Sequence, residues 1–230
     1  MATGGKVNGV ADVIFLLDVT DSMDYCIDAV KKNIHVFVEE MQKEKIDWRA
    51  RIIGFRNYDY NEKDWLDAET SPFTSDVKEL EAQLNAKVAR GGDPEHFPES
   101  ALDALHYCAA RMKVAGKLPA PPMEWRPTGT AAKCIILFTD AEFQETVSYT
   151  DGNFTAHEVA DALNTLRIRL SIIAPQYDCY LDFSEEQGVL YENCGEHKHF
   201  RDKIEQGGYF EKIIRDFART VTATATLEVS

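Results

Sequence analysis

The chain has 230 residues, of which 44% are hydrophobic and 28% are charged, a composition that can supply one large apolar core. The formal net charge is −14. This charge disfavours nucleic acid and anionic membrane surfaces as partners, because both are bound by clusters of Lys and Arg.

No apolar run approaches the roughly 20 residues that a transmembrane helix needs. Residues 1–10 contain no apolar signal core. Three of the five cysteines lie inside apolar patterns, which favours core thiols over a disulfide framework. We therefore expect a cytoplasmic protein that makes no use of a membrane.

The first element along the chain is a continuous apolar run, ADVIFLLD, over residues 11–18. Such a run is typical of a strand that is buried on both faces in a parallel sheet. Apolar residues at helical spacing then predict an amphipathic helix over 25–44. Residues 48–60 predict a second strand, and residues 64–75 a short edge strand in which Pro72 limits pairing.

Helical spacing returns over residues 76–87 and 102–112, and the loop between these two segments is rich in Gly and Pro. Residues 117–130 contain four of the eight prolines and predict an irregular surface loop. Trp125 within this loop is interpreted as a simple connector residue or as an exposed anchor for a partner.

A second apolar run that ends in an acid, CIILFTD, covers residues 134–140. A helix is expected over about 157–166, followed by a third apolar strand over 169–175 and a less regular region. The last helix carries apolar residues from 210 to 221 on one face.

We divide the chain into an N-terminal extension over residues 1–10, one domain over 11–221 and a tail over 222–230. The tail alternates apolar and polar residues and is expected to be an edge strand or a truncated linker. Strands that alternate with helices predict an α/β fold, in which right-handed crossovers place helices on both faces of the sheet. We expect a doubly wound, mostly parallel, Rossmann-like sheet of six strands.

Oxygen-bearing side chains follow the apolar strands. Asp18, Thr20 and Ser22 lie at the end of the first strand, and Asp140 ends a later one. The glycine-rich loop supplies Asp93 within GGDPE. Ligands of open α/β sheets bind outside the carboxyl ends of the strands, and oxygen-only donors favour hard cations such as Mg²⁺, Mn²⁺ or Ca²⁺. The sequence therefore predicts a divalent-metal site at this edge.

These motifs resemble those of a known family. DVTDS resembles the D-x-S/T-x-S signature of von Willebrand factor type A (vWA) domains, and LFTDAE resembles their later TDG element, with Ala141 in place of Gly. GGDPE resembles the corresponding loop of intracellular and bacterial members, and GFRNYDY resembles a strand of the A domains attached to alpha-kinases. The order of elements agrees over about residues 11–217.

The resemblance implies a metal-ion-dependent adhesion site (MIDAS). Thr20 and Ser22 would bind the metal directly, Asp18 and Asp140 mostly through water, and Asp93 directly or through water. One coordination position would remain open for an acidic side chain of a partner protein. The implied function is a protein–protein interaction module with no catalytic residues.

Other interpretations stay open. The hydroxyls could cap a helix, or the metal could be purely structural while partners bind elsewhere. Haloacid-dehalogenase-like phosphohydrolases also begin with an apolar strand that ends in Asp, and in that interpretation Asp18 would be the nucleophile. These enzymes require a second Asp at the position where this chain has Thr20. A zinc site is less consistent with the spacing of its possible ligands, which are Cys179, Cys194, His197 and His199.

Overall fold

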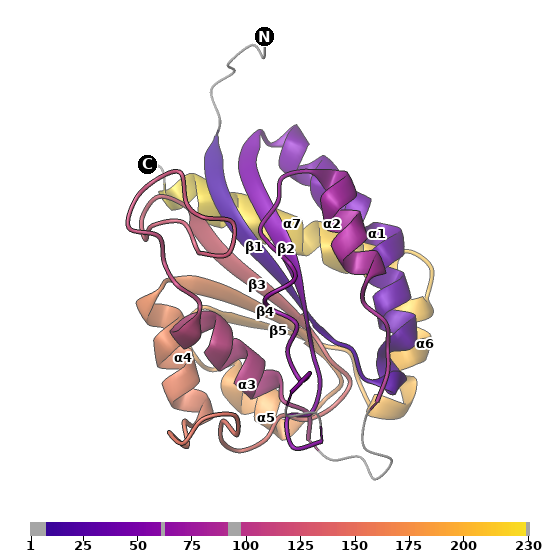
Figure 1. Ribbon diagram of the computed structural model, residues 1–230. Coiled ribbons are helices and arrows are strands. Elements are labelled where there is room, and N and C mark those ends of the chain that lie inside the picture. Colours follow the sequence, from indigo (N-terminus) through magenta and orange to yellow (C-terminus); the bar gives the residue numbers. More distant parts are fainter. Residues whose placement is uncertain (1–7, 61–62, 92–97, 229–230) are drawn as a thin grey trace.

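The structure is a computed structural model that describes residues 8–60, 63–91 and 98–228 (Figure 1). Its centre is a five-stranded sheet in which every adjacent pair of strands is parallel. In spatial order the strands are β2 (Ile46–Phe55), β1 (Gly9–Asp18), β3 (Ala132–Phe138), β4 (Ile168–Ala174) and β5 (Val189–Asn193). The α/β class and the doubly wound, parallel sheet are confirmed.

Helices cover both faces of the sheet (Figure 1). One face carries α1 (Asp24–Lys43), α2 (Val77–Asn85), α6 (Phe200–Glu205) and α7 (Tyr209–Glu228). The other carries α3 (Ala101–His106), α4 (Ala156–Thr165) and α5 (Asp178–Phe183). Three short helical segments complete the fold: η1 (Asp21–Met23), η2 (Tyr107–Arg111) and η3 (His197–His199).

Strand β1 divides the apolar core into two layers, because successive side chains of a strand point to opposite faces. Phe15 packs edge-on against Phe37 of α1 and Phe217 of α7, with ring centroids 5.2 and 6.0 Å away. Ile14 and Leu16 belong to the core beneath α3, α4 and α5. All eight residues from 11 to 18 are buried, as expected for a strand covered on both faces.

The expectation of six strands is wrong by one for the described residues, and the strand set differs. Segment 64–75 forms no strand, and its only β-pairing with β2 is two isolated bridges, Ala50 to Thr74 and Phe55 to Leu66. The expected strand or linker at 222–230 is instead helical as far as Glu228, as the last turns of α7. Strand β5 comes from the region that was expected to be less regular.

The alternating tail forms a helix because of its tertiary packing. Val221 and Ala225, which are one helical turn apart, are both fully buried. Ala225 approaches β1 so closely that a Cβ placed on Gly9 would lie 2.8 Å from its carbonyl carbon. The hydroxyls of Thr222 and Thr224 donate to carbonyls four residues earlier, so these polar side chains are satisfied within the helix.

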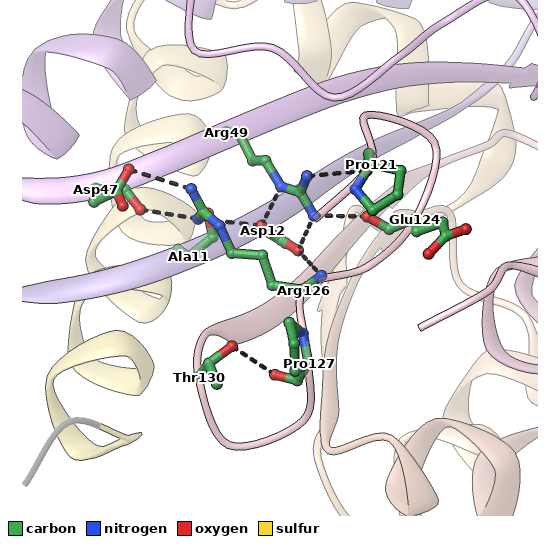
Figure 2. Close-up of polar contacts among 9 residues, drawn as sticks. All are labelled: Ala11, Asp12, Asp47, Arg49, Pro121, Glu124, Arg126, Pro127 and Thr130. Atoms are coloured by element: carbon green, nitrogen blue, oxygen red, sulfur yellow. Dashed lines mark hydrogen bonds and ion pairs between the residues drawn. The ribbon is translucent and has the colours of Figure 1, made fainter. Parts of the chain in front are cut away.

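A buried ion-pair network holds the proline-rich loop at the amino edge of the sheet (Figure 2). Asp12 is fully buried and accepts two hydrogen bonds of 2.7 Å from the guanidinium of Arg49. It also accepts a 2.6 Å bond from the backbone N–H of Arg126. Arg49 in turn donates to the carbonyl of Glu124 at 2.6 Å. The loop is therefore irregular in backbone but fixed in place.

This anchoring buries Trp125 completely, so the interpretation of Trp125 as an exposed anchor is wrong. Its indole N–H donates to the carbonyl of Cys108 at 3.0 Å, and its ring lies 5.2 Å from that of Phe73. The tryptophan closes one end of the core beneath α3 and η2.

All five cysteines are free thiols; only Cys179 is partly exposed. A search for membrane spans over the described residues finds no helix with the length and apolar character to cross a bilayer.

Candidate functional site

The site is built on the last residue of β1. Asp18 is fully buried and both of its carboxylate oxygens accept hydrogen bonds. Oδ1 accepts from the backbone N–H of Thr20 at 3.0 Å and from the Thr20 hydroxyl at 2.6 Å. Oδ2 accepts from the hydroxyl of Thr139 at 2.8 Å. The carboxylate is therefore held in one orientation at the mouth of the strand.

A chain of side-chain oxygens leads from β1 to β3. The hydroxyls of Thr20 and Ser22 lie 3.3 Å apart. The hydroxyl of Ser22 donates to Oδ1 of Asp140 at 3.1 Å. Thr20 and Asp140 are buried, whereas Ser22 is exposed. The structure thus brings together four of the five residues that the sequence predicts as metal ligands.

The fifth nominated residue, Asp93, lies outside the described residues. Its loop nevertheless begins beside the site. The backbone N–H of Asp21 donates to the carbonyl of Gly91 at 2.8 Å, and the N–H of Arg90 donates to the carbonyl of Val19 at 3.0 Å. Gly91 has a φ of 69°, a conformation that suits glycine. Residues 90 and 91 therefore run directly alongside the D-x-T-x-S turn.

The position of the site follows from the strand order. β1 and β3 are neighbours in the sheet but not in sequence, because the chain first goes outward to β2 and then returns to the other side of β1. The order of winding therefore reverses between β1 and β3. Asp18 ends β1, and Asp140 follows β3 by two positions. Parallel doubly wound sheets bind their ligands at this reversal.

Thr139 is a site residue that sequence reasoning missed. It is fully buried and orients Asp18, and its Oγ1 accepts a 3.3 Å bond from the N–H of Ala141. The only sequence signal was its place between an apolar strand and Asp140. Two tyrosines support the same turn: Tyr177 donates to the carbonyl of Asp140 at 3.1 Å, and Tyr180 to that of Ala141 at 2.8 Å.

The site concentrates negative charge in a place shielded from water. Burial raises the pKa of Asp18 well above its ordinary value, and the nearby carboxylate of Asp140 raises it further. None of the ion pairs among the described residues involves Asp18. A buried carboxylate beside a second carboxylate is stabilised by a cation that both can share.

The donor chemistry fits a hard divalent cation. Two carboxylates and two hydroxyls converge, and all four offer oxygen, which Mg²⁺, Mn²⁺ and Ca²⁺ prefer. Among the described residues no group of three or more His, Cys, Asp or Glu side chains is placed to hold a metal ion. That result agrees with a donor set in which only two of the four groups are carboxylates.

Comparison with known proteins gives a likeness in structure alone. No family model matches the sequence, and no curated protein matches it. Among solved structures 181 chains are similar. One is the crystal structure of the SpRpn10 VWA domain, which matches with a TM-score of 0.58 at 10% sequence identity, over 89% of this chain and 93% of the other. The chain therefore has a vWA-like fold.

Proposed function

We propose that this chain is a protein-interaction module that binds an acidic side chain of a partner through a divalent cation at the carboxyl edge of its sheet. The observation that carries this proposal is the hydrogen-bonded series Asp18–Thr20–Ser22–Asp140, which joins β1 to the turn after β3. The vWA-like fold supports it, and so do the motifs DVTDS and LFTDAE, which contain these residues and resemble motifs of vWA domains.

The roles of the residues follow from their chemistry. The hydroxyls of Thr20 and Ser22 would contact the ion directly, because they are small and lie 3.3 Å apart. Asp18 and Asp140 would supply most of the compensating negative charge, and Thr139 would keep Asp18 oriented. Asp93 is proposed as a further ligand from the neighbouring loop. Mg²⁺ or Mn²⁺ would act as a bridge between these groups and an incoming carboxylate.

The first experiment measures the ion. Mn²⁺ titration of the full chain, followed by electron paramagnetic resonance, should show one site that Mg²⁺ competes for. Asp140→Asn should weaken binding strongly, whereas Asp216→Asn on the exposed side of α7 should not. Equal Mn²⁺ affinity in the parent and Asp140→Asn would contradict the proposed ligand set.

The second experiment tests the partner chemistry. A short Asp-containing peptide is added to the Mn²⁺-loaded chain while water proton relaxation is measured. A carboxylate that replaces a metal-bound water should lower the relaxation enhancement, and the matched Asn-containing peptide should not. Metal binding without any response to either peptide would support a structural metal instead.

The phosphohydrolase alternative receives no support from a particular contact. Asp18 is fully buried and both of its oxygens accept hydrogen bonds from threonine groups, so neither oxygen is open to a phosphate ester from solvent. A model phosphate ester assayed in the presence of Mg²⁺ decides the matter. Turnover that disappears in Asp18→Asn would overturn the binding-module proposal.

A further inference from the structure

A pocket of about 590 Å³ lies next to the candidate metal centre, beyond the end of β2. Its wall includes Arg56, which directly follows β2, and Arg90, which precedes the glycine-rich loop. The guanidinium of Arg56 donates to the carbonyl of Arg90 at 3.1 Å, and the N–H of Arg90 donates to the carbonyl of Val19 at 3.0 Å. The pocket is thus joined to the turn between Asp18 and Thr20.

Cations are concentrated in and behind the pocket wall. Arg56 and Lys87 line the pocket and are only 8% and 4% exposed. Arg51, which is 1% exposed, donates to the carbonyl of Ala68 in the wall. Arg51 and Arg56 both disfavour the charged form of Lys87, after burial itself, so the pKa of Lys87 is lowered. Lys87 therefore lies close enough to both arginines to be repelled by each of them.

These buried charges are incompletely neutralised by the described residues. Lys87 forms an ion pair with Asp67 and donates to the hydroxyl of Ser71 at 3.0 Å. The guanidinium of Arg56 donates only to backbone carbonyls, those of Arg90 and Asp64. Within the described part of the chain neither Arg51 nor Arg56 forms an ion pair, and Nε of Arg51 has no hydrogen-bond partner. Of the three buried cations only Lys87 forms an ion pair, and the carboxylates of Asp67, Asp64 and Asp18 act on Arg56 without forming one.

The rim and the far wall define the rest of the ligand. Lys63 and Arg90 are exposed on the rim and add two positive charges. The two remaining lining carboxylates, Asp64 and Glu69, are exposed to water, which screens their charge. Three aromatic residues also line the pocket: Trp65, Tyr107 and Tyr149. The rings of Trp65 and Tyr149 lie 4.9 Å apart and form a continuous aromatic wall.

We propose that this pocket binds a small organic anion, with a phosphate or carboxylate head at Arg56 and Arg90 and an aromatic or planar body against Trp65 and Tyr149. A buried cation without an ion-pair partner is costly, and a ligand anion that contacts Arg56 would supply that partner. The volume lies in the range of ordinary small-molecule sites. This site uses none of the proposed metal ligands.

The binding test uses the full chain, freed of divalent cations on a chelating resin, so that a metal-bound anion cannot contribute. Isothermal titration compares phenyl phosphate, benzoate, inorganic phosphate and the neutral benzyl alcohol. Saturable one-to-one binding of phenyl phosphate or benzoate is expected, about tenfold tighter than inorganic phosphate because of the aromatic wall. No saturable binding of any anion, or equal binding of benzyl alcohol, would overturn the proposal.

Two double variants of equal charge separate contact from long-range attraction. Lys63→Gln with Arg90→Gln alters the exposed rim and should weaken phenyl phosphate binding about tenfold or more. Lys212→Gln with Arg219→Gln removes the same charge from α7, where both side chains are exposed, and should leave binding close to that of the parent. Equal affinities of the two double variants for phenyl phosphate would contradict anion binding in this pocket.

Arg56→Gln gives the largest expected loss, because it removes the buried cation at the proposed head-group position. Circular dichroism establishes whether this variant is folded. Should it fail to fold, the rim variant decides the question alone, since Lys63 and Arg90 are both exposed. Failure of anion binding would leave the proposed metal site untouched, and failure of Mn²⁺ binding would leave this pocket untouched.

Discussion

The hydroxyl of Ser22 lies 3.1 Å from Oδ1 of Asp140, although 118 positions separate the two residues in the chain. This contact joins the turn after β1 to the turn after β3 across the reversal in strand winding. Ser22 is exposed and contributes nothing to the apolar core, whereas Asp140 is buried in the turn after β3. For Ser22, a role in binding is therefore separable from a role in folding.

Ser22→Ala is expected to lower the affinity for Mn²⁺ at least about 10- to 100-fold, the usual scale for losing a group that only supports a metal ligand, because Ser22 is proposed as a ligand itself. Its midpoint of urea unfolding in divalent-free buffer should stay close to that of the parent, because the hydroxyl is exposed. The matched control is Ser184→Ala, whose hydroxyl bonds only within its own helical turn at the end of α5. Loss of Mn²⁺ binding in both variants would contradict a specific role for Ser22.

A second prediction concerns the network in Figure 2. Asp12→Ala leaves the buried guanidinium of Arg49 and the N–H of Arg126 without their acceptor. Removing one partner of a buried ion pair costs about 3–5 kcal/mol of unfolding free energy. Asp47→Ala breaks a contact between Arg126 and a carboxylate that is 50% exposed, and should cost less than about 1 kcal/mol. Urea denaturation measures both values.

Similar losses of unfolding free energy in Asp12→Ala and Asp47→Ala would show that the buried ion pair stabilises the fold no more than the exposed one does. The comparison is well matched, because both variants remove an aspartate that contacts Arg126. Only the degree of burial and the number of bonds differ between them.

A third prediction separates packing from partner contact at Trp125. Trp125→Ala should cost about 3–5 kcal/mol of unfolding free energy, because it removes a fully buried ring together with its bond to the carbonyl of Cys108. Tyr60→Ala, at a side chain that is 59% exposed, should change stability by less than about 0.5 kcal/mol. Unfolding curves that match for Trp125→Ala and the parent would refute the buried position.

The sheet was predictable where burial alone determines the strands. The runs that became β1, β3 and β4 are apolar because they are covered on both faces, and this leaves a signal in the sequence. Edge strand β5 was missed, because four of its five residues are at least partly exposed and Leu190 is 55% exposed. The tail was misread, since its alternation competes with a helical face of which Val221 and Ala225 form part.

The part of the candidate site that lies at the ends of strands was predictable from the sequence. The ends of two parallel apolar strands must meet at one edge, so Asp18 and Asp140 were expected to lie close together. Thr139 was missed because its role is to orient a carboxylate 121 positions earlier, which no local pattern reports. The burial of Trp125 depends likewise on a residue distant in sequence, Asp12, which holds the proline-rich loop at the amino edge of the sheet.

The last prediction concerns acid stability through His106 of α3. This ring is 4% exposed, stacks on Phe154 with centroids 4.4 Å apart, and lies 2.8 Å from the hydroxyl of Tyr149 through Nδ1. Burial lowers the pKa of His106 below its ordinary value, and nearby Arg111 lowers it further. The unfolded chain therefore takes up this proton at a higher pH than the folded chain does.

Because the folded-state pKa is the lower one, the contribution of neutral His106 is present above the ordinary histidine pKa of about 6.5 and is lost as the pH falls below it. Between about pH 7 and about pH 5 the parent should lose more unfolding free energy than His106→Gln, whatever the offset between the two at neutral pH. His35→Gln, at an exposed position of α1, should follow the slope of the parent. Urea denaturation at several pH values measures these slopes, and parallel lines for His106→Gln and the parent would rule out a buried neutral imidazole.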